Sequence, residues 1–213
     1  MVPAHVSVPD DLVLHGPRVL GFASPGRIAD RFGLDRDEVE DRLLEFAARG
    51  WVVHTRFADS GGWSLTEAGR VEDERRMAAE LEVTGAREHV VEAHTRFLPL
   101  NKRFGKVCTD WQLRPTRTEP LAANDHTDWR WDERVLRALA TLGRDLAAVT
   151  DPPARCLQRL DGYSDRYLAA LARVDHGERR WVDSPEVDSC HTVWVQLHED
   201  LLATLGIARG AEG

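Results

Sequence analysis

The sequence contains no apolar run long enough to cross a membrane, for which a helix needs roughly 18 to 20 residues. Its first residues, MVPAHVSVPDD, lack the basic patch and apolar core of a secretory signal. We therefore expect a cytoplasmic protein without a membrane partner. The 213 residues, of which 42% are hydrophobic, suffice for one large domain or two small ones.

Cysteine and lysine are both scarce. The three cysteines, Cys108, Cys156 and Cys190, lie far apart and form no CxxC pair. This indicates reduced, mostly buried thiols rather than a metal or redox site. Of the 28 cationic residues only Lys102 and Lys106 are lysines, and the net charge is −8. A strongly acidic chain is not typical of nucleic-acid binding, although a local basic patch can still occur.

The common catalytic motifs are also missing, since the chain has no GxSxG, P-loop, GxGxxG or HExxH. Cys108 with His126 and Asp110 would supply a nucleophile, a base and an orienting group. His191 and His198 with Asp110 would supply acid–base chemistry. The two histidines lie two helical turns apart, roughly 10.5 Å, which is too far for both to bind one metal ion. We therefore assign no catalytic residue and no metal ligand, leave any cofactor open, and favour a protein that is not an enzyme.

Residues 25–50, PGRIADRFGLDRDEVEDRLLEFAARG, predict two helices joined by a short turn. Ser24 offers an N-cap for the first helix, and Gly33 can end it in a left-handed conformation. Asp35 begins the second helix, in which apolar residues repeat every three or four positions until Gly50. The pattern is that of a helix-turn-helix.

A β-hairpin is predicted next, from the strand WVVHTRF, a glycine-rich turn over 58–62 and the short strand WSL. Thr66 is then the expected N-cap of a long helix over 67–97, which Pro99 should break. A short apolar helix is expected before the helix-turn-helix, over 12–22, and Gly16-Pro17 should weaken or split it.

The segments RIADRFGLDRDEVEDRLLEFAARGWV and WSLTEAGR, with the hairpin between them, resemble winged-helix regulators of the MarR and PadR type. In those families the equivalent of residues 65–70 leads from the wing strand into the next helix. The resemblance covers about residues 12–75. It implies a winged helix-turn-helix domain over 1–75 and binding to double-stranded DNA, for which we expect a homodimer.

The charge of this domain conflicts with DNA binding. Residues 1–75 contain nine arginines and fourteen acidic residues, and the outward positions of the second predicted helix of the pair are mostly acidic. Phosphate contacts need cations, and carboxylates beside phosphates are repulsive. The residues that would have to contact DNA are Arg27, Arg31, Arg36, Arg42 and Arg56. The alternative is a winged helix that serves protein contacts or dimerisation.

Residues 76–213 predict an all-helical ligand-binding or dimerisation domain, a small bundle. After a helix, or a helix with an irregular end, over 100–113 comes a polar loop over 115–127 and a helix over 128–149. Asp151-Pro152-Pro153 should be a firm break. Further helices are expected over 154–174 and 186–205, with a turn over 177–185. The predicted fold class is therefore mainly α with a small β-wing, an N-terminal winged helix-turn-helix plus a C-terminal helical bundle.

Polar and aromatic residues in this second half suggest a small-molecule pocket, which combines apolar walls with a few converging polar groups. The candidate ligand-binding residues are Asn101, Arg103, Asp110, Trp111, His126, His191, Trp194 and His198. The competing interpretation is that the tryptophans fill a core and the charged residues solvate its rim.

Two functions follow from these patterns. The first is a dimeric winged-helix transcriptional regulator whose helical domain senses a small ligand. The second is an enzyme or small-molecule-binding protein with its chemistry in the helical domain and a winged helix that no longer reads DNA.

Overall fold

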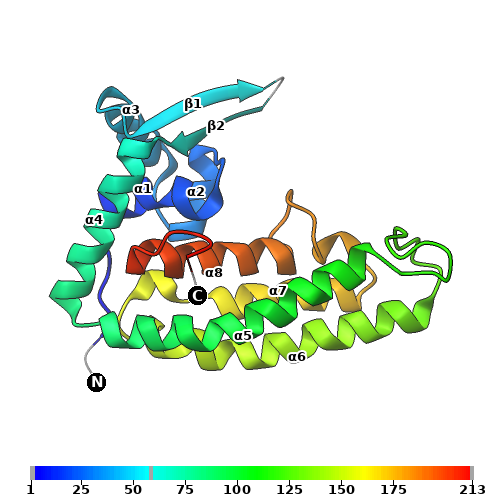
Figure 1. Ribbon diagram of the computed structural model, residues 1–213. Coiled ribbons are helices and arrows are strands. Elements are labelled where there is room, and N and C mark those ends of the chain that lie inside the picture. The colour runs from blue at the N-terminus through cyan, green and yellow to red at the C-terminus, as the bar shows by residue number, and fades with distance from the viewer. Residues whose placement is uncertain (1–2, 58–59, 212–213) are drawn as a thin grey trace. The chain divides into compact units, whose positions relative to one another are not determined.

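The computed structural model describes residues 3–57 and 60–211, which form eight α-helices and one antiparallel pair of strands (Figure 1). The elements are α1 (Pro9–Leu20), α2 (Pro25–Phe32), α3 (Arg36–Ala48), β1 (Val52–Phe57), β2 (Ser60–Leu65), α4 (Glu67–Thr84), α5 (Arg87–Gln112), α6 (Trp129–Ala154), α7 (Tyr163–Asp175) and α8 (Cys190–Leu205). The predicted class, mainly α with a small β-wing, is confirmed. Within the described ranges, no helix has both the length and the apolar character that crossing a bilayer requires.

The chain divides into two compact units. The first, called the winged unit, comprises Met1–Val91, Pro153–Leu160 and Gln196–Gly213. The second, called the helical unit, comprises Glu92–Pro152 and Asp161–Val195. The domain boundary predicted after residue 75 falls within α4, and the winged unit includes two later segments that the sequence did not assign to it.

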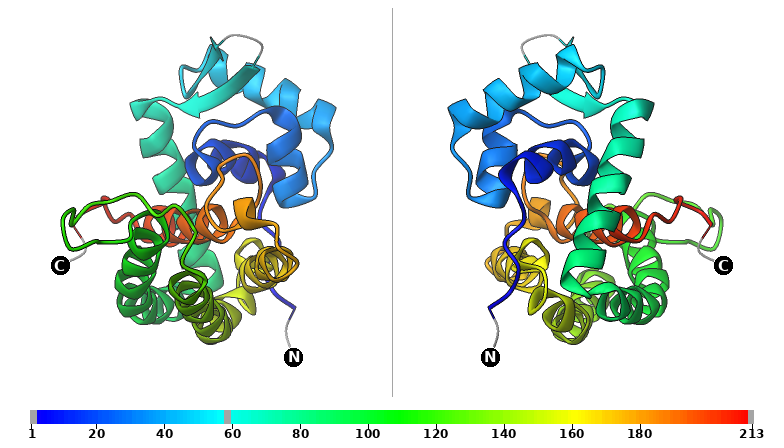
Figure 2. Two further views of the ribbon diagram at one scale, coloured as in Figure 1. Left: turned by 90° about the vertical axis from the view of Figure 1, so that its right-hand side faces the viewer. Right: turned by 90° about the vertical axis from the view of Figure 1, so that its left-hand side faces the viewer.

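Helix α1 is the central element of the winged unit. It packs on α2, α3, α4 and β2, and these elements surround it in Figure 2. The expected break at Gly16-Pro17 is wrong, because α1 is continuous with Pro17 inside it. Its residues from Leu12 to Val19 are all buried, so packing offsets the hydrogen bond that proline cannot donate. A Cβ at Gly16 would lie 2.8 Å from Ile28 Cγ2, so glycine allows α1 and α2 to pack closely.

The helix-turn-helix forms as its capping residues predict. The Ser24 hydroxyl accepts a hydrogen bond from the backbone N–H of Arg27 at 3.3 Å, and Gly33 ends α2 with a φ of 67°. The Asp35 carboxylate accepts hydrogen bonds from the backbone N–H groups of residues 37 and 38 at 2.9 and 3.1 Å. These short-range caps fix where both helices begin.

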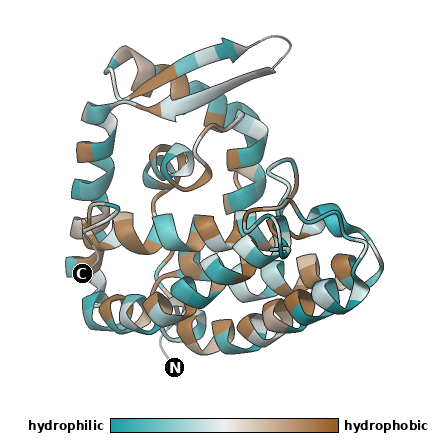
Figure 3. Ribbon diagram, turned by 45° about the vertical axis from the view of Figure 1, so that its right-hand side comes forward, coloured by the Kyte–Doolittle hydropathy of each residue, from teal (hydrophilic) through white to brown (hydrophobic). Residues whose placement is uncertain are grey.

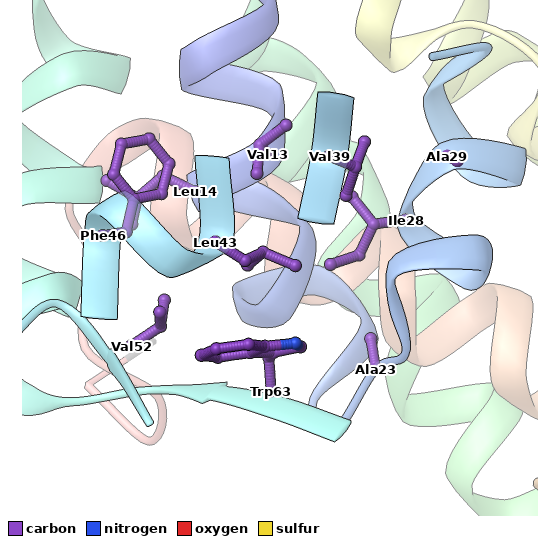
Figure 4. Close-up of a cluster of buried hydrophobic side chains, with 10 residues drawn as sticks. All are labelled: Val13, Leu14, Ala23, Ile28, Ala29, Val39, Leu43, Phe46, Val52 and Trp63. Carbon is purple, nitrogen blue, oxygen red and sulfur yellow. The ribbon is translucent and has the colours of Figure 1, made fainter. Parts of the chain in front are cut away.

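Strands β1 and β2 pair from Val52 opposite Leu65 to Phe57 opposite Ser60. Residues 58 and 59 of the predicted turn lie outside the described residues. The structure adds a bridge that the sequence did not predict, in which Ala23 and Trp63 exchange backbone hydrogen bonds of 2.8 and 3.1 Å. In Figure 4 the Trp63 ring from β2 lies among side chains of the helices, and it completes the apolar core.

The predicted long helix over 67–97 is wrong. Helix α4 ends at Thr84, and Gly85 follows with a φ of 63°, a conformation that glycine adopts without strain. Helix α5 then runs through Pro99, which was expected to break it. Pro99 is exposed, while Phe97 and Phe104 on either side are buried, so packing maintains the helix across the proline.

The helical unit is built on an antiparallel pair, α5 and α6. Trp131 of α6 donates to the carbonyl of Asp110, whereas Arg103, earlier in α5, contacts Asp145, later in α6. Apolar and polar residues alternate around both helices in Figure 3. Helix α7 joins them where the Tyr167 hydroxyl donates to the carbonyl of Leu139 at 3.2 Å.

The predicted ends of the last three helices also need correction. Helix α6 continues through Pro152-Pro153 to Ala154. Because Pro152 has no N–H, it cannot donate to the carbonyl of Ala148 four residues earlier. The Arg96 guanidinium donates to that carbonyl instead, at 3.5 Å. Helix α7 starts only at Tyr163, because Gly162 before it has a φ of 77°. Helix α8 starts at Cys190 rather than near 186.

Candidate functional site

Three of the arginines predicted to contact DNA are exposed on the winged unit. Arg27 lies in the first turn of α2, Arg36 in the first turn of α3, and Arg56 on β1. All three side chains can therefore meet a partner from solution.

The other two predicted arginines are engaged within the winged unit. Arg42 pairs with Asp10 at 3.0 Å and with Glu45 at 3.2 Å. Arg31 is half-buried and donates to the carbonyl of Arg159 at 3.1 Å. A phosphate would have to compete with these partners.

The outward surface of α3 is dominated by exposed carboxylates, from Asp37, Glu38, Glu40, Asp41 and Glu45. Beside the helix is a hollow of about 440 Å³ with an apolar floor and a rim of four carboxylates and one arginine. It is lined by Pro9, Asp10, Val13, Leu34, Glu38, Val39, Asp41, Arg42 and Glu45. This face disfavours phosphate.

The hairpin differs in charge from α3. Neither strand contains an acidic residue, and both His54 and Arg56 are exposed on β1. The His54 ring lies against Trp63, with 4.9 Å between ring centroids. The wing and the first turn of α2 thus each expose a cation outside α3, Arg56 and Arg27.

A buried ionic network lies inside the winged unit, and the sequence did not predict it. Its centre is His15 of α1, which is fully buried. His15 Nδ1 lies 3.0 Å from Asp73 of α4, and Nε2 lies 3.2 Å from Asp200 of α8. Burial by itself lowers the pKa of His15, but the charges of Asp73 and Asp200 outweigh it and raise that pKa to about 9. His15 is therefore a cation at neutral pH.

Arg159 extends this network from a 3₁₀ turn over Gln158–Leu160. Its guanidinium bonds to Glu80 at 2.8 Å, to Thr204 at 2.8 Å and to Asp200. The Ser7 hydroxyl donates to Glu80 at 2.5 Å. Burial raises the pKa of Asp200, but Arg159 and His15 outweigh that effect and hold it well below its ordinary value. We define the buried network as Ser7, His15, Asp73, Glu80, Arg159, Asp200 and Thr204.

The residues of the buried network come from five separate stretches of chain, so no local motif reveals them. The available signal is an ionisable residue at an inward position among apolar neighbours, as His15 in LVLHGP and Asp200 in LHEDLL. Buried charges are normally paired. Such positions indicate that a buried ionic network exists, but they do not show which residues pair with one another.

The predicted ligand-binding residues fall into separate groups. The first surrounds Phe104: Trp194 stacks on it at 4.3 Å between centroids, and His191 at 6.1 Å. Asn101 accepts a hydrogen bond from the Trp194 indole N–H at 3.0 Å. Trp194 is 1% exposed, so this group is part of the core of the helical unit.

A second group surrounds His126 in the loop before α6. The His126 ring lies against Trp111 at 4.4 Å, and its Nδ1 lies 3.1 Å from both carboxylate oxygens of Asp132. Asn124 donates to Asp132 at 3.0 Å and to the carbonyl of Trp111 at 2.9 Å. His126 has a φ of 56°, a strained conformation that these contacts hold.

Arg103 and Asp110 form the third group, in a groove of about 600 Å³ between α5 and α6. The groove, called the α5–α6 groove, is lined by Arg103, Lys106, Val107, Asp110, Trp131, Arg134, Val135 and Ala138. His198, the last predicted ligand residue, belongs to the winged unit. The structure thus gathers the predicted residues by twos and threes rather than into one pocket.

The imagined catalytic arrangement around Cys108 has no geometric support. His126 pairs with Asp132, and Asp110 pairs with Lys106 at 2.7 Å. Burial raises the pKa of the Cys108 thiol to about 12, whereas a nucleophilic cysteine needs a lowered pKa. In the described part of the chain, no three His, Cys, Asp or Glu side chains gather closely enough to hold a metal ion.

At the level of class, the protein consists of a winged unit and a helical unit. Comparison of the chain with protein-family models, with curated proteins and with solved structures finds no match.

Proposed function

We propose that the protein is a cytoplasmic winged-helix transcriptional regulator that acts as a homodimer on double-stranded DNA. The observation that supports this most is the layout of the winged unit. A helix-turn-helix is followed by a β-hairpin, and Ala23 bridges Trp63 beside it, with Arg27 and Arg56 exposed. The helical unit supplies the response to a small ligand.

In this proposal the wing and the first turn of α2 make the leading DNA contacts. Two like charges about 4 Å apart repel by about 1 kcal/mol even in water, so an α3 laid along phosphates would be repelled at several positions. Arg42 would not compensate, because it already pairs with Asp10 and Glu45. A homodimer presents Arg27 and Arg56 twice, which doubles the cations available to phosphates.

Fluorescence anisotropy with labelled genomic fragments at low salt tests the proposal. We expect Arg56→Ala and Arg27→Ala to weaken binding on all fragments, and each removed arginine that touches a phosphate to reduce the salt slope by about 1. Arg137→Ala, an exposed position on α6, is the matched control. Absence of binding at micromolar protein would overturn DNA reading.

Glu40→Gln separates two docking modes, because it neutralises an exposed acid of α3. If the wing leads, this substitution changes DNA affinity little. A clear gain in affinity would mean that α3 lies against phosphates, and the wing-led arrangement would then be wrong.

A second candidate is favoured by the acidic surface of α3. In this alternative the protein is an enzyme or a small-molecule-binding protein, and its winged unit no longer reads DNA. Ligand binding by the helical unit together with no DNA binding in the anisotropy experiment would select this alternative. His191→Ala and His198→Ala separate the two functions, because loss of ligand response with DNA binding intact supports the sensor, whereas loss of a turnover reaction supports the enzyme.

A further inference from the structure

The α5–α6 groove has two matched walls. Arg103, Lys106, Val107 and Asp110 occupy positions i, i+3, i+4 and i+7 of α5, and Trp131, Arg134, Val135 and Ala138 occupy the same spacing on α6. Each wall therefore spans two helical turns, roughly 10.5 Å. Val107, Val135 and Ala138 give the groove an apolar floor. Its volume of about 600 Å³ falls within the range of small-molecule sites.

The rim of the groove is cationic. Arg103, Lys106 and Arg134 line it against a single lining carboxylate, that of Asp110. Lys106 pairs with Asp110 at 2.7 Å, and Arg103 pairs with Asp145 at 3.1 Å. The three cations therefore face two carboxylates, those of Asp110 and Asp145, which leaves a net charge of +1.

Arg134 is the cation that remains for a ligand. Its guanidinium lies 4.1 Å from the centre of the Trp131 ring. Among the described residues, none places a carboxylate within ion-pair distance of it. It is exposed and already oriented by the ring, so little conformational entropy is lost when it binds an anion.

Trp131 is held in place as one end wall. Its indole N–H donates to the carbonyl of Asp110 at 2.6 Å, which fixes the ring across the groove from α6 to α5. A fixed, half-buried indole offers a flat apolar surface to a ligand ring without further ordering.

We propose that the α5–α6 groove binds a small organic phosphate, with the phosphate at Arg134 and at Lys106, which exchanges its bond to Asp110 for the ligand, and the apolar or ring-shaped body along the floor. A phosphate monoester carries close to two negative charges at neutral pH, which suits two cationic side chains better than the single charge of a carboxylate does. The roughly two-turn length suits a molecule the size of a nucleoside monophosphate. This inference deepens the ligand response in the proposed function and rests on it for its biological use.

Isothermal titration calorimetry on the full chain without DNA tests the site directly, with AMP and phenyl phosphate as probes. We expect at least one of the two probes to bind with a dissociation constant below about 1 mM. Inorganic phosphate and adenosine, each offering half of the ligand, should bind at least tenfold more weakly, and benzoate should bind more weakly than phenyl phosphate. Equal binding of inorganic phosphate, or tighter binding of benzoate, would overturn the assignment to an organic phosphate.

Variants separate the groove from non-specific charge. Arg134→Ala should weaken the binding probe at least tenfold, and Trp131→Phe, which keeps a ring, should weaken it less than Trp131→Ala. Arg137→Ala, one turn along α6 and outside the groove lining, should not change affinity. No binding of either probe, or equal binding by Arg134→Ala, would overturn the site. Because these measurements contain no DNA, they can fail while the anisotropy experiment succeeds, and the reverse.

Discussion

The interiors of the two units differ in chemistry. In the winged unit, buried side chains include His15, Asp73, Arg159 and Asp200, which are joined by charge-assisted hydrogen bonds. In the helical unit, the deepest side chains include rings, with Trp194 stacked on Phe104. The first interior depends on protonation and on complete pairing, because an unpaired buried charge is costly. The second depends on volume and shape. Stability of the winged unit should therefore respond to pH and to single charge changes more strongly than that of the helical unit, where Asp132 is a buried carboxylate paired at the start of α6.

The largest expected effect comes from removing Arg159. Arg159→Met leaves Glu80 and Asp200 buried without their guanidinium, and we expect about 3–5 kcal/mol less stability. Urea unfolding followed by circular dichroism measures the loss, and hydrogen exchange of α1 and α4 localises it. Adding Glu80→Gln and Asp200→Asn should recover part of it. Failure to recover would indicate that packing rather than charge explains the effect.

The next effect is a dependence on pH through His15. Its pKa is about 9 in the folded chain against an ordinary 6.5, so protonated His15 stabilises the fold fully below pH 6.5. That contribution, at most about 3 kcal/mol, is lost as pH rises through 9. Unfolding free energies between pH 6 and 10 should fall for the native chain and fall less for His15→Gln.

A direct readout of the same group is an NMR titration of the His15 imidazole. A midpoint near the ordinary value of 6.5 would contradict the role given to Asp73 and Asp200.

A smaller effect is expected in the helical unit. Trp194→Phe removes part of the stack on Phe104 and the hydrogen bond to Asn101, which should lower stability by about 2 kcal/mol. The decrease should be the same at pH 6 and pH 9. A pH-dependent decrease would remove the contrast between the two interiors.

The smallest effect belongs to the rim of the buried network. Ser7→Ala removes the hydroxyl that donates to Glu80, whose carboxylate keeps its bond to Arg159, so we expect stability to fall by about 1 kcal/mol. The midpoint of urea unfolding measures it. A decrease as large as that of Arg159→Met would mean that Ser7 holds more than Glu80 in place.

Features set by a few neighbouring residues were predictable from the sequence. The caps at Ser24, Gly33, Asp35 and Thr66 formed as expected, because each needs only its own turn of chain. Pro17 and Pro99 did not break their helices, since tertiary packing outweighs a single missing hydrogen bond.

The site residues divide in the same way. Arg103 and Asp110, which were predicted as ligand-binding residues, both line the α5–α6 groove, because they lie seven positions apart on one face of α5. Their partners Trp131 and Arg134 could not be paired with them, since the register of α5 against α6 is a tertiary property. The buried network could not be predicted either, because its residues come from five separate stretches of chain that meet only in the folded protein.

The span of the buried network has a consequence for synthesis of the chain. Ser7 and His15 leave the ribosome long before Arg159 and Asp200 do, because more than 140 residues separate the two pairs. Until then His15 has one of its two carboxylates and Glu80 lacks its guanidinium. Closing contacts over such separations is entropically slow. The amino-terminal part of this protein should thus finish folding last, and a fragment ending at residue 75 should not reach the native state of the winged unit.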